Sequence, residues 1–131
     1  MNPSNSGKSI GNLSDFIKLD DKGLIVAVIQ HVDTGQVLMV GYMNPESLEV
    51  TLREKKACFW SRSRKTLWLK GETSGNVLHV EEIRTDCDAD ALVLKCRPAG
   101  PTCHTNETSC FYRRVESDGT VVLDGDGVAP Q

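Results

Sequence analysis

Hydrophobic and polar positions follow a strand-like pattern over most of the chain from Leu24 onward. Two β-branched runs in residues 24–43 flank Asp33-Thr34-Gly35, a typical turn sequence, which predicts a hairpin. Further strand-like runs are separated by Ser, Gly, Pro and Asp residues, at positions 57–62, 66–71, 76–84, 91–97, 110–116 and 121–123. The pattern predicts a mainly β (α+β) fold with one or two short helices, arranged as a strongly bent sheet or partial barrel (a pseudo-barrel).

One segment between the strand-like runs has a helical pattern. Asn44 is suited to be the N-cap, Pro45 to occupy the first helical position, and Glu46 to lie in the first turn. Leu48 and Leu52 are four residues apart and would share one face. We therefore expect a short amphipathic helix in residues 44–56.

The ends of the chain differ from its centre. Residues 1–12 are polar and rich in Ser, Asn and Gly, which predicts a disordered tail. Residues 13–124 then form a single domain, consistent with a length of 131 residues, and residues 125–131 form a flexible C-terminal tail.

Composition narrows the range of functions. A net charge of -3 argues against general nucleic-acid binding. No apolar run has the length of a membrane span and the N-terminus lacks the apolar core of a signal peptide, so we expect a cytoplasmic protein with no membrane partner. In a reducing compartment, an odd number of cysteines (five) favours metal ligands, reactive thiols or core residues over a disulfide framework.

Three aspartates occupy alternate positions of the segment that begins at Asp86. If the segment is extended, Asp86, Asp88 and Asp90 lie on one face and Cys87 lies on the other. Three carboxylates on one face repel each other unless a cation neutralises them, and Mg²⁺ suits such oxygen ligands. A solvated acidic edge strand is the alternative explanation.

A calcium-binding EF-hand loop does not explain these aspartates. Such a loop needs glycine at its sixth position and glutamate at its twelfth, and these positions hold Ala91 and Arg97. The flanking segments also have the pattern of strands rather than helices.

The cysteines divide into two groups. Cys58 and Cys96 lie within apolar strand-like runs, which favours buried core positions. Cys87, Cys103 and Cys110 remain as candidate zinc ligands, and three protein ligands with one open position are typical of catalytic zinc.

Three thiolates would acidify a bound water less than three imidazoles do, so a neighbouring base would help. His104 is the candidate base, with a fourth ligand or a plain loop residue as alternatives, whereas His31 and His79 are expected to be structural.

A basic segment, residues 55–70, carries six Lys or Arg residues, no acid, and two tryptophans, Trp60 and Trp68. A loop of small hydrogen-bonding residues follows at 71–76. Arginines and backbone N–H groups bind phosphate, and tryptophan can stack on a base, so this segment predicts a site for a phosphorylated small molecule. A nucleic-acid groove and a solvated face with two core tryptophans are the alternatives.

These features in this order resemble the phosphoribosyl-AMP cyclohydrolase family of histidine biosynthesis. The resemblance spans about residues 24–115, and the motifs that carry it are GYMN (41–44), FWSRSRKTLWLKGETSGN (59–76), DCDADAL (86–92) and GPTCHTNETSCF (100–111). The chain departs from the family at Asn106-Glu107, where a glycine-containing turn is expected.

The resemblance implies a role for each group of residues. It implies a small bent mixed sheet in an intertwined homodimer, with Mg²⁺ bound by the aspartates and one Zn²⁺ per subunit bound by the three cysteines, Cys87 reaching a site shared across the dimer. The implied substrate-binding residues are Trp60, Ser61, Arg62, Ser63, Arg64, Lys70, Glu72, Thr73 and Ser74.

The same resemblance implies a hydrolytic reaction. A zinc-bound water attacks C6 of the N1-ribosylated adenine of phosphoribosyl-AMP, the N1–C6 bond breaks, and a formimino-linked imidazole carboxamide ribotide results, with His104 as candidate proton shuttle. A zinc-dependent purine deaminase and a non-catalytic zinc- or redox-sensing module are the rival functions. The deaminase signature H-x-E…P-C-x-x-C is absent from the sequence.

Overall fold

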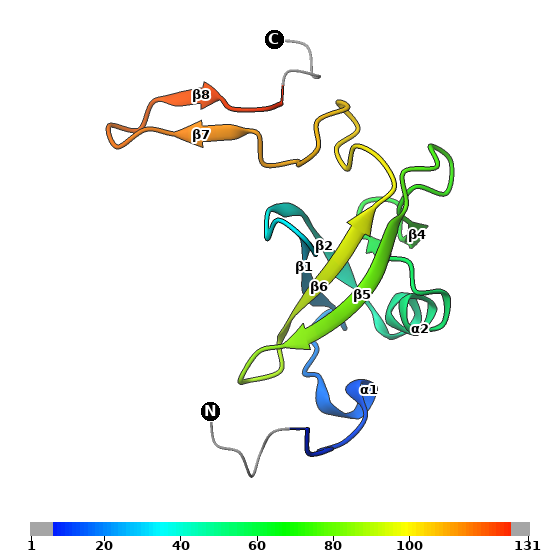
Figure 1. Cartoon of the computed structure of the whole chain (residues 1–131). Helices are drawn as coiled ribbons and strands as arrows, with labels where there is room; N and C mark the ends of the chain where they lie inside the picture. Colours follow the sequence, from blue (N-terminus) through cyan, green and yellow to red (C-terminus); the bar gives the residue numbers. More distant parts are fainter. Residues whose placement is uncertain (1–6, 127–131) are drawn as a thin grey trace.

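The computed structural model describes residues 7–126, and the remaining residues of the two expected tails, 1–6 and 127–131, lie outside that range. The chain is mainly β with two short helices, which confirms the predicted fold class (Figure 1). None of the helices in residues 7–126 is long and apolar enough to cross a membrane. The elements are α1 (Leu13–Phe16), β1 (Ile25–His31), β2 (Val37–Met43), α2 (Pro45–Glu54), β3 (Cys58–Ser61), β4 (Thr66–Leu69), β5 (Leu78–Thr85), β6 (Ala91–Pro98), β7 (Arg113–Val115) and β8 (Val121–Leu123).

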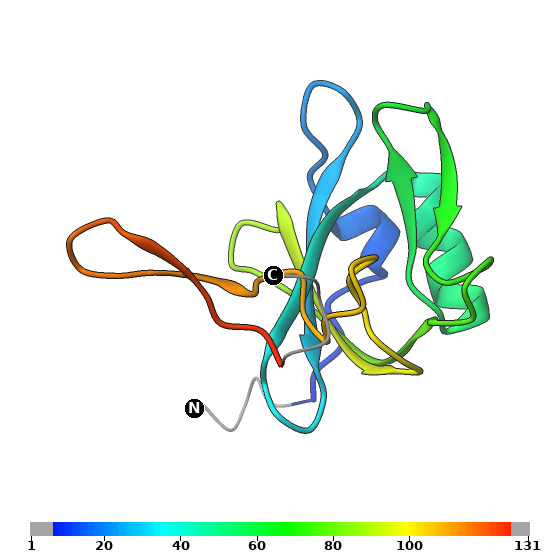
Figure 2. The same ribbon diagram turned by 90° about the horizontal axis from the view of Figure 1, so that it is seen from above.

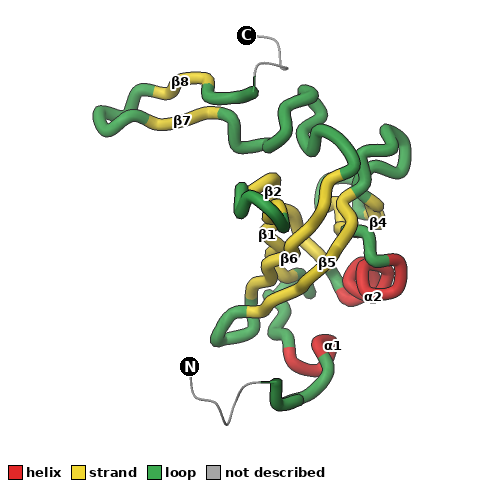
Figure 3. The backbone as a smooth tube through the Cα atoms, viewed as in Figure 1, coloured by secondary structure: helices red, strands yellow, loops and turns green. Residues whose placement is uncertain are grey.

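A four-stranded mixed sheet with strand order β2-β1-β6-β5 forms the centre of the fold. The predicted hairpin in residues 24–43 is confirmed, since β1 pairs antiparallel with β2. β5 and β6 form a second antiparallel pair, and the two pairs join where β1 runs parallel to β6, with Val28 opposite Val93. Over the described residues the sheets stay open and do not close into a barrel (Figure 3).

The core lies on one face of this sheet because alternate strand residues point toward it. In β6, Leu92, Leu94 and Cys96 are fully buried, and burial of each leucine contributes about 2 kcal/mol relative to leaving it exposed. Cys58 is also buried, so the prediction that Cys58 and Cys96 are core residues is confirmed. Burial raises the pKa of the Cys96 thiol to about 12, with a smaller contribution from the charge of Glu81, which keeps this thiol protonated and unreactive.

The helix α2 begins as the sequence predicts. The Asn44 side chain accepts a hydrogen bond from the Ser47 backbone N–H (2.8 Å), and the Ser47 hydroxyl accepts one from the Asn44 backbone N–H (2.9 Å). The expected apolar face is partly wrong, because Leu48 is buried but Leu52 is 41% exposed. Thr51 takes the inward position instead, and its hydroxyl bonds the backbone N–H of Cys58 (2.9 Å), fastening α2 to β3.

Two smaller hairpins flank the central sheet. β3 pairs with β4, and β3 lies so close to β2 that a Cβ on Gly41 would come within 2.6 Å of the Phe59 ring. The β7–β8 hairpin extends away from the body of the protein (Figure 2). The predicted strand 110–116 is therefore confirmed only for Arg113–Val115, because Cys110 instead donates its backbone N–H to Leu38 of β2 (2.7 Å).

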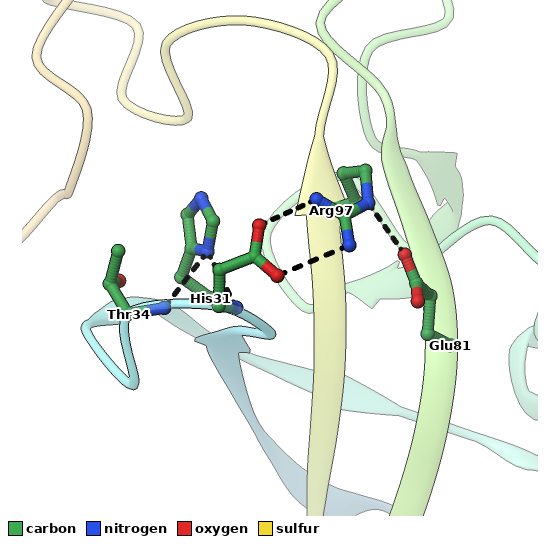
Figure 4. A network of polar contacts seen from close by, with 5 residues as sticks. His31, Thr34, Glu81 and Arg97 are labelled. Carbon is green, nitrogen blue, oxygen red and sulfur yellow. Dashed lines mark hydrogen bonds and ion pairs between the residues drawn. The ribbon is translucent and has the colours of Figure 1, made fainter.

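A polar network fixes the β1–β2 turn to the sheet (Figure 4). The guanidinium of Arg97 bonds both carboxylate oxygens of Asp33 (2.6 and 3.2 Å) and, through Nε, the carboxylate of Glu81 (2.7 Å). His31 Nδ1 accepts the backbone N–H of Asp33 (3.1 Å), which gives His31 the structural role expected from the sequence. The network stabilises the end of the sheet near the start of β2, where Ser109 and Cys110 bond the carbonyls of Val37 and Leu38.

Candidate functional site

The three aspartates converge in a turn rather than along a strand. β5 ends at Thr85 and β6 begins at Ala91, so the expectation of an extended segment with alternating faces is wrong. The carboxylates of Asp86, Asp88 and Asp90 nevertheless gather, with one oxygen of each lying within 4.8 Å of the others. We call Asp86–Asp90 the acid turn.

Hydrogen bonds within the acid turn hold this arrangement. The Asp86 carboxylate accepts the backbone N–H groups of Asp90 (3.0 Å) and Ala91 (3.2 Å). Ala89 adopts a left-handed backbone conformation (φ 61°), and its carbonyl accepts the backbone N–H of Lys18 (2.7 Å). The acid turn is thus built mainly from contacts between residues that are neighbours in the sequence.

The carboxylates of the acid turn influence each other's ionisation. Desolvation acts to raise the pKa of Asp86, but hydrogen bonds from Asp90 and from the backbone outweigh it, and the pKa lies below its ordinary value. The hydrogen bond with Asp86 and the charges of Asp86 and Asp88 raise the pKa of Asp90. A bound cation would relieve this repulsion, and three exposed carboxylates fit a hard cation such as Mg²⁺.

Cys87 lies in the acid turn and is exposed. The S–H group of Cys87 donates to the Asp88 carboxylate over 3.7 Å. The prediction that Cys87 points away from the aspartates, on the other face of a strand, is therefore wrong. The acid turn and the loop that carries Cys103 and Cys110 lie at opposite ends of β5 and β6 (Figure 1). Among residues 7–126, Cys87 accordingly does not join these two cysteines in a cluster.

The cysteine loop, residues 99–112, brings Cys103 and Cys110 together. The backbone N–H of Cys103 bonds the carbonyl of Glu107 (3.1 Å), and the N–H of Asn106 bonds the carbonyl of Cys103 (2.9 Å). Asn106 occupies the turn where the family suggests glycine, and its φ of 71° is one that asparagine tolerates. The departure from the family motif therefore leaves a tight turn in place.

The two thiols of the cysteine loop differ in their electrostatics. Desolvation acts to raise the pKa of Cys103, but three other influences outweigh desolvation. These are the Thr105 hydroxyl, which donates a hydrogen bond to the Cys103 sulfur (3.0 Å), the Cys110 thiol and the charge of Lys70. The pKa of Cys103 is therefore lowered. Desolvation and the neighbouring charge of Cys103 raise the pKa of Cys110 to about 11. Two neighbouring thiols suit Zn²⁺, which would hold both as thiolates, and the charge of Lys70 favours the same ionised forms.

A cavity of about 470 Å³ opens at these thiols. His104 is exposed at its edge, which places the candidate base beside the candidate zinc ligands. The lining residues are Cys103, His104, Thr105, Cys110, Phe111, Tyr112 and Arg113. Thr105 was not singled out from the sequence, and its place two residues after a candidate ligand was the only signal available.

One part of the predicted substrate segment contacts Tyr42, and another part lies near the cysteine loop. The residues of this segment fall into three places: Trp60 and Ser61 end β3, Arg62, Ser63 and Arg64 lie in the β3–β4 turn, and Lys70, Glu72, Thr73 and Ser74 follow β4. At one end, the Arg62 guanidinium lies 4.0 Å above the Tyr42 ring. At the other end, the positive charge of Lys70 influences both thiols of the cysteine loop.

A second cavity, of about 570 Å³, opens beside the acid turn. Tyr42 lines it together with Asp88 and Asp90, and Lys18 and Asp20 contribute from the chain before β1. Sequence reasoning missed Lys18 and the role of Tyr42. The motif GYMN contains Tyr42, but no pattern in the sequence indicates that this residue lines a cavity with the aspartates.

Comparison with known proteins shows the family to which the chain belongs. The family described as Phosphoribosyl-AMP cyclohydrolase matches residues 39–112, more than half of the chain. The chain belongs to this family. A phosphoribosyl-AMP cyclohydrolase of Chloroherpeton thalassium is 57% identical over 108 residues, which are 82% of this chain and 77% of the relative. A protein of the same name from Sphingopyxis alaskensis is 52% identical over 109 residues, 83% of this chain and 86% of the relative.

Membership of the phosphoribosyl-AMP cyclohydrolase family confirms the predicted enzyme class, a hydrolase that acts on a cyclic amidine. The matched residues include β3, β4, the acid turn and the cysteine loop, so the motifs on which the resemblance was based lie inside the family match. Membership favours this class over the deaminase and the sensing module.

Proposed function

We propose that the protein hydrolyses the N1–C6 bond of the adenine ring of 1-(5-phosphoribosyl)-AMP, a step of L-histidine biosynthesis, in the cytoplasm. The observation that carries the proposal is the cysteine loop, where Cys103 and Cys110 share a cavity with His104. Water adds to C6, the N1–C6 bond breaks, and a proton is transferred to N1. His104 is the candidate group to take the proton from water and return it to nitrogen.

The protein's own residues would bind the metals and the substrate. Cys103 and Cys110 would hold Zn²⁺, which when bound supplies the Lewis acidity that makes water nucleophilic near neutral pH. The acid turn would hold Mg²⁺ against a substrate phosphate. The residues from Trp60 to Ser74 would bind the ribose and phosphate groups, with Arg62 beside Tyr42 and Lys70 near the thiols.

A homodimer would complete the zinc site. Catalytic zinc takes three protein ligands, and one chain gathers two thiols in the cysteine loop, while Cys87 lies at the far end of β6. Eight strand residues span roughly 25 Å, so the third thiol would come from a second copy. The extended β7–β8 hairpin supports this proposal, because Val115 and Val121 expose 64% and 58% of their surface and would be covered in a dimer.

The proposed reaction is tested with purified protein and 1-(5-phosphoribosyl)-AMP. Turnover should require zinc, disappear on metal removal and return when zinc is restored. His104→Ala should keep bound zinc and lose rate by about a hundredfold, the typical contribution of a general base. Full turnover by metal-free protein would exclude the reaction as proposed, and a normal rate for His104→Ala would exclude only the proton-shuttle role.

The shared zinc site is tested by mixing two inactive variants, Cys87→Ala and Cys110→Ala. Heterodimers would make up about half of a 1:1 mixture and carry one intact site of two, so about a quarter of wild-type activity should return. No recovery despite demonstrated subunit exchange would show that each chain builds its own site.

A further inference from the structure

A buried carboxylate lies in the middle of the cysteine loop. Glu107 is only 2% exposed, although His104 and Asn106 beside it are exposed. Burial of a carboxylate is costly unless hydrogen bonds compensate for the lost water. The groups that bond Glu107 should therefore be important for the conformation of the loop.

One partner of Glu107 comes from the C-terminal end of the described chain. The backbone N–H of Asp126 donates to Glu107 Oε2 over 2.8 Å, and the Thr108 hydroxyl donates to the Asp126 carboxylate. Gly125 fits closely against the same group, because a Cβ there would lie within 2.3–2.4 Å of the Glu107 carboxylate atoms. Gly125 is not among the glycines with positive φ, so the close approach rather than the backbone conformation requires glycine.

The main chain at Glu107 also holds the first ligand of the proposed zinc site. The Glu107 carbonyl accepts the backbone N–H of Cys103 (3.1 Å), and the next carbonyl, of Thr108, accepts that of Thr102 (3.2 Å). The second ligand, Cys110, is anchored separately to Leu38 of β2. Glu107 is thus the point where the C-terminal segment is joined to the Cys103 end of the loop.

We propose that Glu107 is a positioning residue of the zinc site, whose buried carboxylate fastens residues 125–126 across the cysteine loop and thereby fixes Cys103 relative to Cys110. The inference rests on the proposed function in that the two thiols are taken as zinc ligands. The fastening itself is independent of the metal. Loss of the carboxylate should release the C-terminal segment and loosen the geometry of the thiol pair.

The fastening is tested by amide hydrogen exchange in the full-length protein without metal. Glu107→Ala should accelerate exchange at the amides of Asp126 and Cys103, whereas Glu107→Gln, which still offers an oxygen to Asp126, should restore most of the protection. Glu116→Gln, an exposed carboxylate next to β7, is the matched control. Wild-type exchange in Glu107→Ala would overturn the proposal.

Positioning of the thiols is tested by titration with Co²⁺ in place of zinc. Thiolate-to-cobalt absorption should be altered and affinity reduced roughly tenfold in Glu107→Ala, the lower range for groups that support metal ligands, and Glu107→Gln should recover both. Unchanged cobalt affinity and spectrum in Glu107→Ala would overturn the positioning role. A wild-type protein without thiolate-to-cobalt absorption would instead contradict the proposed zinc site, so the two failures are distinguishable.

Gly125→Ala gives a second test that leaves the carboxylate in place. The added methyl group should displace the Glu107 carboxylate and reproduce the reduced cobalt affinity. In the double variant Glu107→Ala/Gly125→Ala, the methyl group should add little to the effect of Glu107→Ala, because the carboxylate atoms that it would meet are absent. Additive effects of the two substitutions, or a normal Gly125→Ala, would overturn the proposal.

Discussion

The acid turn and the cysteine loop are both candidate metal sites, but they are built in different ways. The acid turn gathers its carboxylates within five consecutive residues, and Asp86 closes it by bonding backbone N–H groups four and five positions away. The cysteine loop depends on distant partners, including Leu38 for Cys110 and Asp126 for Glu107. The conformation of the acid turn should therefore tolerate changes elsewhere in the fold, whereas the conformation of the cysteine loop should be sensitive to such changes.

The largest effect is expected when a ligand of the cysteine loop is removed. Cys103→Ala should lose bound zinc and reduce turnover by about a thousandfold or more, since metal catalysis contributes several kcal/mol. Zinc content by elemental analysis and steady-state kinetics measure this. Cys96→Ala, which removes a core thiol instead, should keep its zinc. Retention of zinc by Cys103→Ala would contradict the assignment.

Removal of one carboxylate from the acid turn should have a smaller effect, mainly on the dependence on Mg²⁺. Asp88→Asn should raise the Mg²⁺ concentration needed for half-maximal activity roughly tenfold, because charge count sets affinity for hard cations. Zinc content should stay at the wild-type level, and Asp118→Asn in the β7–β8 turn should behave as wild type. A parallel loss of zinc would show that Asp88 also positions Cys87, the proposed third zinc ligand.

The pKa difference between the two thiols predicts their order of ionisation. In metal-free protein, the pH midpoint of iodoacetamide labelling should be lower for Cys103 than for Cys110, whose pKa is about 11. A lowered pKa means more thiolate at a given pH, so labelling of Cys103 should begin at the lower pH. Peptide mass spectrometry of samples labelled across a pH series measures both midpoints.

The hydroxyl of Thr105 is the main hydrogen-bond donor responsible for this order. Thr105→Val removes the hydroxyl and should shift the Cys103 midpoint to higher pH, while Thr105→Ser keeps the hydroxyl and should leave the midpoint near its wild-type value. An identical midpoint in Thr105→Val and wild type would contradict the role of this hydrogen bond.

The smallest effect should come from a long-range anchor of the cysteine loop. Ser109 is buried, and its hydroxyl donates to the Val37 carbonyl of β2 over 2.7 Å. The same hydroxyl accepts the backbone N–H of Phe111 (2.9 Å). Ser109→Ala should therefore reduce the free energy of unfolding by about 2 kcal/mol, since one hydrogen bond typically contributes about 1 kcal/mol net. Urea denaturation measures the loss, with exposed Ser117→Ala as control. Mg²⁺ dependence should not change, and a change there would contradict the local construction of the acid turn.

Sequence reasoning was most successful where short segments decide the structure. The Asn44 cap, the turn at Asp33-Thr34-Gly35 and the buried thiols of Cys58 and Cys96 were all predictable, because each depends on local hydrogen bonding or on an apolar neighbourhood in the sequence. The placement of the aspartates and Cys87 on opposite faces failed because alternating residues do not distinguish an extended segment from a turn between two strands.

The sequence by itself determined the family, the kinds of metal ligand available and the motifs that carry them. The tertiary structure decided which ligands meet. It placed Cys87 and the cysteine loop at opposite ends of β6, and it brought Glu107 against Gly125 and Asp126. Spacing along a chain does not specify these separations and contacts, because they arise only when the strands pair and the two ends of β6 receive different neighbours.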